Sequence, residues 1–249
     1  MTRRNSSQLL LVRHAESHGN VAREESEASD SETIAIDVRD AVVALSPLGE
    51  GQAVAFGQWL AELPTVRQPT RAWASSYRRA RQTAEIALAA GAVGCPLRVD
   101  ERLRDRELGV LDRLTARGVQ ARYPSEADRR RYLGKFYYRP PGGESWADVV
   151  LRLRSFLADI SDELSHGVVL IVAHDAVVLL LRYICQELDE ATLLDIARTR
   201  SVGNASITRL VRDDVTDPWT LDLDNVQHHL VEHGSVPTAH EAEHDVDPR

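Results

Sequence analysis

The side chains best suited to chemistry lie close together near the start of the sequence. The stretch LVRHAESHGN, residues 11–20, brings Arg13, His14, Ser17 and Asn20 within eight positions. A neutral imidazole can attack phosphorus and form a phosphohistidine, provided that a hydrogen bond on its second nitrogen fixes the tautomer. Arginine remains charged and has planar, forked donors that match phosphoryl oxygens. This stretch therefore holds residues that suit phosphoryl transfer through a histidine, if other segments supply their partners.

Three later stretches offer the partners that such a reaction needs. They are SYRRARQTAE (76–85) with Arg78, Arg79 and Arg81, RLRDRELG (102–109) with Asp105 and Glu107, and IVAHD (171–175) with His174 and Asp175. A carboxylic acid can protonate the leaving oxygen, and its carboxylate can then activate the water that hydrolyses the intermediate. Arginine donors can stabilise the transition state without a metal ion, so we expect neither a metal nor a cofactor.

The reactive stretches follow predicted strands, which should bring them to one place. Short apolar runs at 8–12 and 168–173 are typical of strands buried on both faces of a parallel sheet. Further strands are predicted at 71–75, 96–99, 205–211 and 219–223, and helices at 46–63, 76–90, 145–164 and 176–188. This alternation predicts an α/β fold with a mostly parallel central sheet and helices on both faces, in three layers. In such sheets the ligand site lies beyond the carboxyl ends of the strands.

The remaining segments are harder to interpret. Residues 21–40 contain seven acids and two arginines, which predicts an exposed, mobile loop. Residues 103–145, rich in Arg, Tyr, Pro and Gly, are interpreted as an inserted subdomain, called the cap below. We expect one domain over residues 1–226 and a flexible tail over 227–249. That tail holds five of the nine histidines, for which metal binding is a weak alternative.

The overall composition narrows the class of partner. A formal net charge of −8 and a pI near 5.6 argue against nucleic acids and membrane surfaces, which a basic face would have to neutralise. A small phosphorylated substrate remains compatible with clustered arginines. The two cysteines lack the spacing of a disulfide framework or zinc site, and no apolar run is long enough for a bilayer or signal peptide. The cytoplasm is the expected location, and a homodimer is left open.

Taken in order, the four stretches resemble the signature of the histidine phosphatase superfamily, which has the phosphoglycerate-mutase-like fold. RHAESHGN matches the family's Arg-His-Gly-Glu-Ser/Thr segment followed by Asn, with Ala15 in place of the usual Gly. RARQTA matches Arg-Ala-x-Gln-Thr-Ala, LRDRELG aligns with the Leu-x-Glu segment, and IVAH aligns with the strand before the second histidine. These matches run from about Leu9 to Leu210, most of the chain.

The resemblance implies a role for each matching residue. His14 would be the nucleophile, Arg13, Asn20 and Arg79 would contact the phosphoryl group with Ser17 nearby, and His174 would donate to it. The proton donor would be Asp105, with Asp in place of Glu, and Glu107 is the reserve candidate. Asp175 replaces the usual Gly, and it is a residue that some distant members use as the acid.

The cap refines the position within the family. KFYYRPPGGES, residues 135–145, resembles the Tyr-Arg-Tyr-Pro-Lys-Gly-Glu-Ser segment of fructose-2,6-bisphosphatase-type members. Substrate binding by Lys135, Tyr137 and Arg139 is therefore expected, with packing of the cap as the alternative. Gly142 and Leu179 stand where that type has a phosphate-binding Lys and an Arg, which argues against that exact substrate. The resemblance thus implies a phosphomonoesterase, with mutase-type transfer or a non-catalytic phospholigand-binding module as alternatives.

Overall fold

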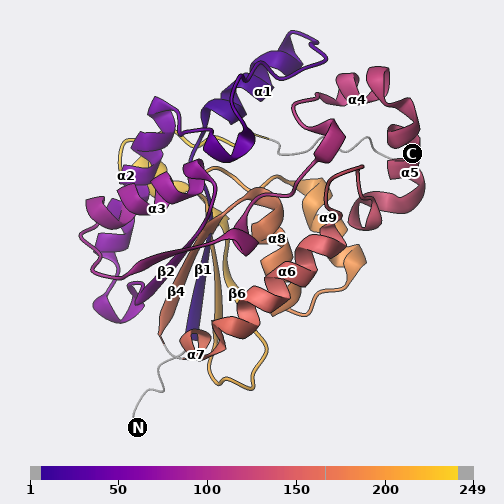
Figure 1. Ribbon diagram of the computed structural model, residues 1–249. Coiled ribbons are helices and arrows are strands. Elements are labelled where there is room, and N and C mark those ends of the chain that lie inside the picture. The colour runs from indigo at the N-terminus through magenta and orange to yellow at the C-terminus, as the bar shows by residue number, and fades with distance from the viewer. Residues whose placement is uncertain (1–6, 166, 241–249) are drawn as a thin grey trace.

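A six-stranded sheet with helices on both faces forms the centre of the molecule (Figure 1), confirming the predicted fold class. The computed structural model describes residues 7–165 and 167–240. The strands are β1 (Ser7–Arg13), β2 (Arg71–Ser75), β3 (Leu97–Asp100), β4 (Val168–Ala173), β5 (Ile207–Arg212) and β6 (Thr220–Val226). Their order across the sheet is β3-β2-β4-β1-β5-β6.

The first four strands along the chain are mutually parallel, whereas the last two reverse direction. Strand β4 lies between β1 and β2 and is parallel to both, and β3 is parallel to β2. Strand β5 runs antiparallel to β1, and β6 antiparallel to β5. In the β1–β4 register Arg13 pairs with Ala173, so His14 and His174 leave the sheet side by side.

Ten α-helices surround the sheet in the described part of the chain. They are α1 (His18–Ala28), α2 (Pro47–Glu62), α3 (Arg78–Ala90), α4 (Ala116–Arg122), α5 (Pro124–Tyr137), α6 (Trp146–Asp159), α7 (Ser161–Leu164), α8 (Asp175–Cys185), α9 (Glu190–Thr199) and α10 (His228–Glu232). Helices α2 and α3 pack on one face of the sheet, and α6 and α8 on the other (Figure 1). Successive residues of β1 alternate between these two cores, because neighbouring side chains on a strand point to opposite faces.

Local signals in the sequence explain where the main helices begin. The Ser46 hydroxyl accepts a hydrogen bond from the Gly49 amide, and Pro47 occupies the first turn of α2. At the start of α6, Ser145 and Asp148 form the predicted capping box. The single helix predicted over 145–164 is instead two, because α6 ends at Asp159 and α7 begins after Ile160.

The prediction of a loop over residues 21–40 is wrong for its first part, where the structure has α1. A capping box starts this helix: the Ser17 hydroxyl accepts from the Asn20 amide, and the Asn20 side chain accepts from the Ser17 amide. Glutamate and arginine are compatible with a solvent-exposed helix, so acidity alone did not indicate a loop. A short 3-10 helix, η1 (Asp40–Val42), begins at the last residue of this segment.

The prediction of a flexible tail is wrong for residues 227–240. His229 and Leu230 of α10 are fully buried, and the Gln52 side chain donates to Val236 and Thr238. Single residues anchor this part of the tail. Such isolated contacts leave no periodic apolar pattern in the sequence, so the pattern did not indicate them. Residues 241–249, including His244, lie outside the described part of the chain.

The cap lies beside the carboxyl edge of the sheet and contains helices α4 and α5 (Figure 1). It contacts the segment after α1 through a β-bridge between Thr33 and Leu114. Across the residues that the structure describes, no helix has the length and apolar character required to cross a membrane.

Candidate active site

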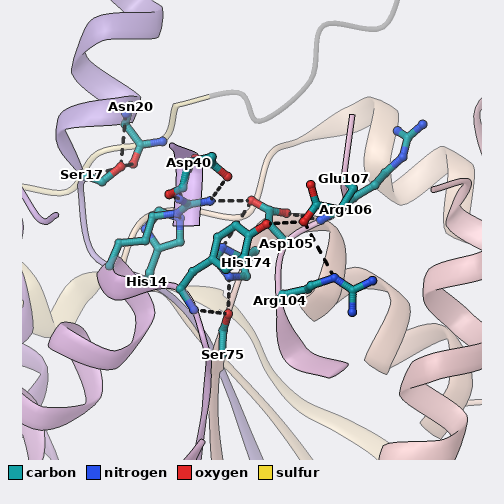
Figure 2. A network of polar contacts seen from close by, with 12 residues as sticks. His14, Ser17, Asn20, Asp40, Ser75, Arg104, Asp105, Arg106, Glu107 and His174 are labelled. Atoms are coloured by element: carbon teal, nitrogen blue, oxygen red, sulfur yellow. Dashed lines mark hydrogen bonds and ion pairs between the residues drawn. The ribbon is translucent and has the colours of Figure 1, made fainter. Parts of the chain in front are cut away.

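Two histidines from neighbouring parallel strands form the centre of the site (Figure 2). His14 follows β1 and His174 follows β4, and both side chains are buried. Their rings meet edge to face, with centroids 5.2 Å apart. The sheet register therefore brings together two groups that are 160 positions apart in the sequence.

The surroundings of His14 fix its tautomer. Nδ1 lies 2.7 Å from the carbonyl oxygen of Ala15, and because a carbonyl can only accept, Nδ1 must hold the proton. Nε2 is then an acceptor, and it receives a hydrogen bond from Nε of Arg79 at 3.1 Å. Burial, followed by the positive charge of Arg79, holds the pKa of His14 well below its ordinary value. His14 is therefore a neutral imidazole with an unprotonated Nε2, the form required of a nucleophile.

Arg79 lies in the first turn of α3, and its buried guanidinium reaches both His14 and two carboxylates. Nη2 donates to Oδ2 of Asp105 at 2.9 Å, and the two Nη atoms donate to the carboxylate of Asp40 at 2.8 and 3.1 Å. Burial alone would lower the pKa of Arg79, but the charges of Asp40 and Asp105 outweigh it and raise the pKa. Asp40 was not among the predicted site residues.

Asp105 is the acid that contacts both Arg79 and the second histidine. Its Oδ2 lies 2.9 Å from Arg79 Nη2 and 3.3 Å from Nδ1 of His174. Glu107 lies beyond it, next to Arg104, and accepts a hydrogen bond from the Tyr77 hydroxyl at 2.7 Å (Figure 2). Position thus favours Asp105 over Glu107 as the proton donor.

A serine supports His174 from below (Figure 2). Nε2 of His174 lies 2.8 Å from the Ser75 hydroxyl, which also accepts from the Tyr77 amide. If the Ser75 hydroxyl donates its proton to Nε2, the other ring nitrogen carries the proton that faces Asp105. Burial, followed by the charges of Arg79 and Arg152, lowers the pKa of His174 well below its ordinary value. His174 is therefore a neutral imidazole that the sheet holds beside His14.

Arg13 is buried beneath the site at the end of β1. Its Nη1 donates to the carbonyl oxygens of Val202 and His240, the latter at 2.8 Å. Among the described residues its Nε has no hydrogen-bond partner. Burial lowers the pKa of Arg13 below its ordinary value, although the charge of Asp175 opposes this effect. An anion in the cleft would meet an arginine that retains unused donor capacity.

Ser17 and Asn20 line the cleft, but they also fix the start of α1. The Oδ1 atom of Asn20 accepts from the Ser17 amide at 3.0 Å and from Nδ2 of Asn204 at 3.3 Å. Asn204 is fully buried and also donates to the carbonyl oxygen of His14 at 3.1 Å. The predictions did not include Asn204. It precedes β5, which is antiparallel, so the beginning of that strand, not its end, lies at this edge.

Asp175, the first residue of α8, lines the cleft next to the catalytic edge. Burial raises its pKa, with the charge of Arg13 opposing the shift. Its Oδ1 accepts a hydrogen bond from the Val202 amide at 3.4 Å. Asp175 therefore reaches the same corner of the cleft as Arg13.

The three predicted cap residues are not brought into the cleft. Lys135 lies over the Trp146 ring, 4.9 Å from its centroid. The Tyr137 hydroxyl bonds to Glu190, and Arg139 forms an ion pair with Asp148 at the start of α6. In this structure these side chains contact α6 and α9, and Tyr137 and Arg139 are exposed, so substrate binding by the three residues stays a prediction.

The cleft above the two histidines is open to solvent, and about 980 Å³ of free space, part of it bulk solvent, lies along its lining residues. One wall, from the segment between α1 and α2, is apolar and contains Ile34, Ile36, Val38 and Val43. Residues 105–108 and 112–113 of the cap also line the cleft, and Arg113 forms hydrogen bonds with the backbone of Ile34 and Ile36. The space is thus charged at its floor and partly apolar toward its mouth.

Ala15 fits where the resembling family has Gly. It is fully buried, its amide donates to the Thr83 hydroxyl at 3.0 Å, and it is not among the residues with positive φ. A methyl group beside His14 therefore introduces no backbone strain.

A metal centre has no candidate in residues 7–165 and 167–240. Within these ranges no cluster of three or more His, Cys, Asp or Glu side chains is arranged to hold an ion. Among the tail histidines in that part of the chain, His240 instead contacts the carboxylates of Glu16 and Glu24.

A parallel sheet that presents a neutral histidine, a second histidine and two arginines at one edge defines a phosphoryl-transfer type of site. The sequence model of the histidine phosphatase superfamily (branch 1) matches residues 9–226, and the chain belongs to this superfamily.

Relatives within the superfamily carry different activities in their names. The chain is 36% identical over 152 residues to a probable phosphoglycerate mutase GpmB from Erwinia tasmaniensis, a match that covers 60% of this chain and 61% of that protein. It is 31% identical over 176 residues to the probable fructose-2,6-bisphosphatase C732.02c from Schizosaccharomyces pombe, covering 71% of this chain but 37% of that protein. The chain thus spans less than two thirds of either relative.

A solved structure resembles the chain over nearly its whole length. The mycobacterial glucosyl-3-phosphoglycerate phosphatase Rv2419c superposes with a TM-score of 0.70 at 28% identity, covering 89% of this chain and 100% of that one. An alpha-ribazole phosphatase from Shigella flexneri has a TM-score of 0.69 at 20% identity, covering 88% of this chain and 96% of that one, which supports the shared fold alone.

Proposed function

We propose that the protein hydrolyses a small phosphomonoester through a phosphohistidine intermediate. The observation that carries this proposal is the unprotonated Nε2 of His14, which accepts a hydrogen bond from Arg79 at 3.1 Å. The same guanidinium donates a hydrogen bond to Asp105. A nucleophile, a cation and an acid are thus assembled from the chain's own side chains.

In the first step Nε2 of His14 attacks phosphorus, and the bond from phosphorus to the leaving oxygen breaks. Asp105 in its protonated form gives its proton to that oxygen. The proton on Nδ1 stays in its hydrogen bond to the Ala15 carbonyl and stabilises the charged phosphohistidine. Arg79 and His174 stabilise the charge on the phosphoryl oxygens.

In the second step water attacks the phosphohistidine. The Asp105 carboxylate takes a proton from this water, the bond from nitrogen to phosphorus breaks, and inorganic phosphate leaves. Nε2 of His14 recovers its lone pair, and Asp105 is again protonated. The cycle consumes one water and needs no other reactant.

The cleft supports a small organic leaving group. Its apolar wall of Ile34, Ile36 and Val38 suits a partly apolar group beyond the phosphate. The name of the similar mycobacterial phosphatase supports a small phosphorylated metabolite as the substrate class.

The test is hydrolysis of para-nitrophenyl phosphate, followed by a panel of phosphorylated metabolites. Wild-type protein should release phosphate, whereas His14→Ala should be inactive. Rapid quenching should trap an acid-labile, base-stable phosphoenzyme only when His14 is present. If no phosphomonoester in a broad panel is hydrolysed while inorganic phosphate still binds, the protein is a binding module and the proposal fails.

Mutase-type transfer is the second candidate, because the Erwinia relative is named a probable phosphoglycerate mutase. A mutase must return the phosphoryl group to an acceptor before water reaches it. Incubation with 3-phosphoglycerate separates the two activities: a hydrolase yields glycerate and phosphate, whereas a mutase yields the 2-phospho isomer.

A further inference from the structure

Asp40 holds the catalytic arginine from the side opposite the nucleophile. Arg79 has five N–H groups, and the structure gives each of them an acceptor. Nε donates to His14, one N–H of Nη2 donates to Asp105, and the other three donate to Asp40. Two of those three reach the Asp40 carboxylate and one reaches its backbone oxygen.

These contacts divide the guanidinium into two parts. The Nε and Nη2 edge faces the reacting groups, His14 and Asp105. The end formed by Nη1 and Nη2 is clamped by both carboxylate oxygens of Asp40, the bidentate geometry that fixes a guanidinium plane most firmly. Only the edge toward His14 can therefore receive phosphoryl oxygens without breaking the clamp.

The position of Asp40 suits a holding role. Its element, η1, lies between the apolar cleft wall and α2, and the neighbouring Val43 is buried. In the described chain the Asp40 carboxylate has hydrogen bonds to Arg79 only. The guanidinium itself is buried, so without Asp40 its orientation would depend on groups that change during the reaction.

We propose that Asp40 is a positioning residue that orients Arg79, so that its Nε and Nη2 edge faces the phosphoryl group on His14. This inference rests on the proposed function and adds to it a residue outside the four sequence stretches. Asp40 does not touch the reacting atoms: it acts through Arg79.

The contacts of Arg79 also give Asp105 and Asp40 different roles. Asp105 lies on the edge that meets the phosphoryl group, so an incoming oxygen can replace it on Nη2 and release the carboxyl group toward the leaving oxygen. Asp40 remains on the far end and balances the arginine charge throughout. Arg79 thus contacts both the proposed proton donor, Asp105, and the proposed positioning residue, Asp40.

The experiment is a double-mutant cycle between Asp40 and Arg79, read by the dissociation constant of inorganic phosphate and by kcat/KM. Asp40→Asn keeps the side-chain size but replaces one acceptor oxygen with a donor. It should weaken phosphate binding and lower kcat/KM by about 10- to 100-fold, because small misplacements of a positioning group have effects of this order. In the Arg79→Lys background the same change should have an effect of less than about twofold, because Lys offers no planar fork to clamp.

Asp37→Asn is the matched control. It makes the same charge change on the same segment, but Asp37 is exposed and does not line the catalytic cleft. It should leave both readouts near wild type. Thermal unfolding of each variant shows whether the fold is retained, and Asp40→Ala serves as a second variant if Asp40→Asn does not fold.

Two results would overturn the inference. If Asp40→Asn binds phosphate as tightly as wild type or more tightly, Asp40 is a bystander or a competitor for the arginine. If the loss is equally large in the wild-type and in the Arg79→Lys background, Asp40 does not act through the guanidinium. A protein without phosphatase activity would refute the proposed function, whereas the phosphate-binding cycle would still test the clamp.

Discussion

Oδ2 of Asp105 lies 3.3 Å from Nδ1 of His174, although the two residues come from the cap and from the end of β4. The same oxygen accepts a hydrogen bond from Arg79. This arrangement ties the acid of the cap to the catalytic edge of the sheet. In the proposed mechanism the cap therefore contributes the acid, and its residues also line the cleft.

Asp105→Asn should lower kcat by about 100- to 1,000-fold, because an amide cannot protonate a leaving group. Glu107→Gln is the matched control, and we expect it to lose less than about threefold because Glu107 bonds to Tyr77. The Asp105→Asn loss should be smaller on para-nitrophenyl phosphate than on an alkyl phosphate, since nitrophenolate leaves without a proton. The assignment is wrong if Glu107→Gln shows the larger loss and the stronger dependence on leaving group.

Asn204→Ala should reduce kcat about 10-fold, because Nδ2 of Asn204 donates to the backbone carbonyl of the nucleophile. It should also lower the free energy of unfolding by about 1–3 kcal/mol, since the fully buried Asn204 side chain loses its hydrogen bonds to the His14 carbonyl, to Asn20 and from the Thr238 hydroxyl. Steady-state kinetics and urea unfolding of the same preparation measure both effects. A stability loss with unchanged kcat would mean that Asn204 has no role in positioning His14.

A chelator should leave activity unchanged, because Arg79, His174 and Asp105 provide charge stabilisation and the proton in the proposed mechanism. Activity should be measured after exhaustive dialysis against EDTA, with phosphate release as the readout. Loss of activity that Mg²⁺ or Zn²⁺ restores would show that the proposed metal-free mechanism is wrong.

The fully buried His229 should make stability depend on pH. Burial lowers its pKa to about 4, so the folded protein keeps this ring neutral where the unfolded chain takes up a proton. Its contribution is complete above about pH 6.5 and is lost as the pH falls toward 4, up to about 3 kcal/mol. His229→Phe should reduce this loss. Urea unfolding at several pH values measures the slope, and an equal slope in both proteins would contradict the assignment.

The sheet and the site residues that follow parallel strands could be predicted, because both depend on local patterns. Apolar runs identified β1 and β4, and their parallel pairing places His14 and His174 together. Asp40 could not be found in this way. It lies in a segment with six other acids, and its contact with Arg79 spans 39 positions without a local signal.

Asn204 and α1 were missed for different reasons. Asn204 lies at the site because β5 is antiparallel to β1. An apolar run predicts a strand but does not indicate its direction in the sheet. The start of α1 did have a signal, the spacing of Ser17 and Asn20, which form its capping box. The acidic composition of the residues that follow favoured a loop, and the prediction followed the composition.

The contact between Arg13 and His240 spans 227 positions and has a consequence for how activity arises during synthesis. Translation runs from the N-terminus, so the ribosome adds the carbonyl that receives Arg13 227 residues after Arg13 itself. A nascent chain can complete β1, α2 and α3 and still lack this acceptor. Catalytic competence should therefore appear late, after the sheet has formed, and a stalled chain ending before residue 236 should be folded in its core but poorly active.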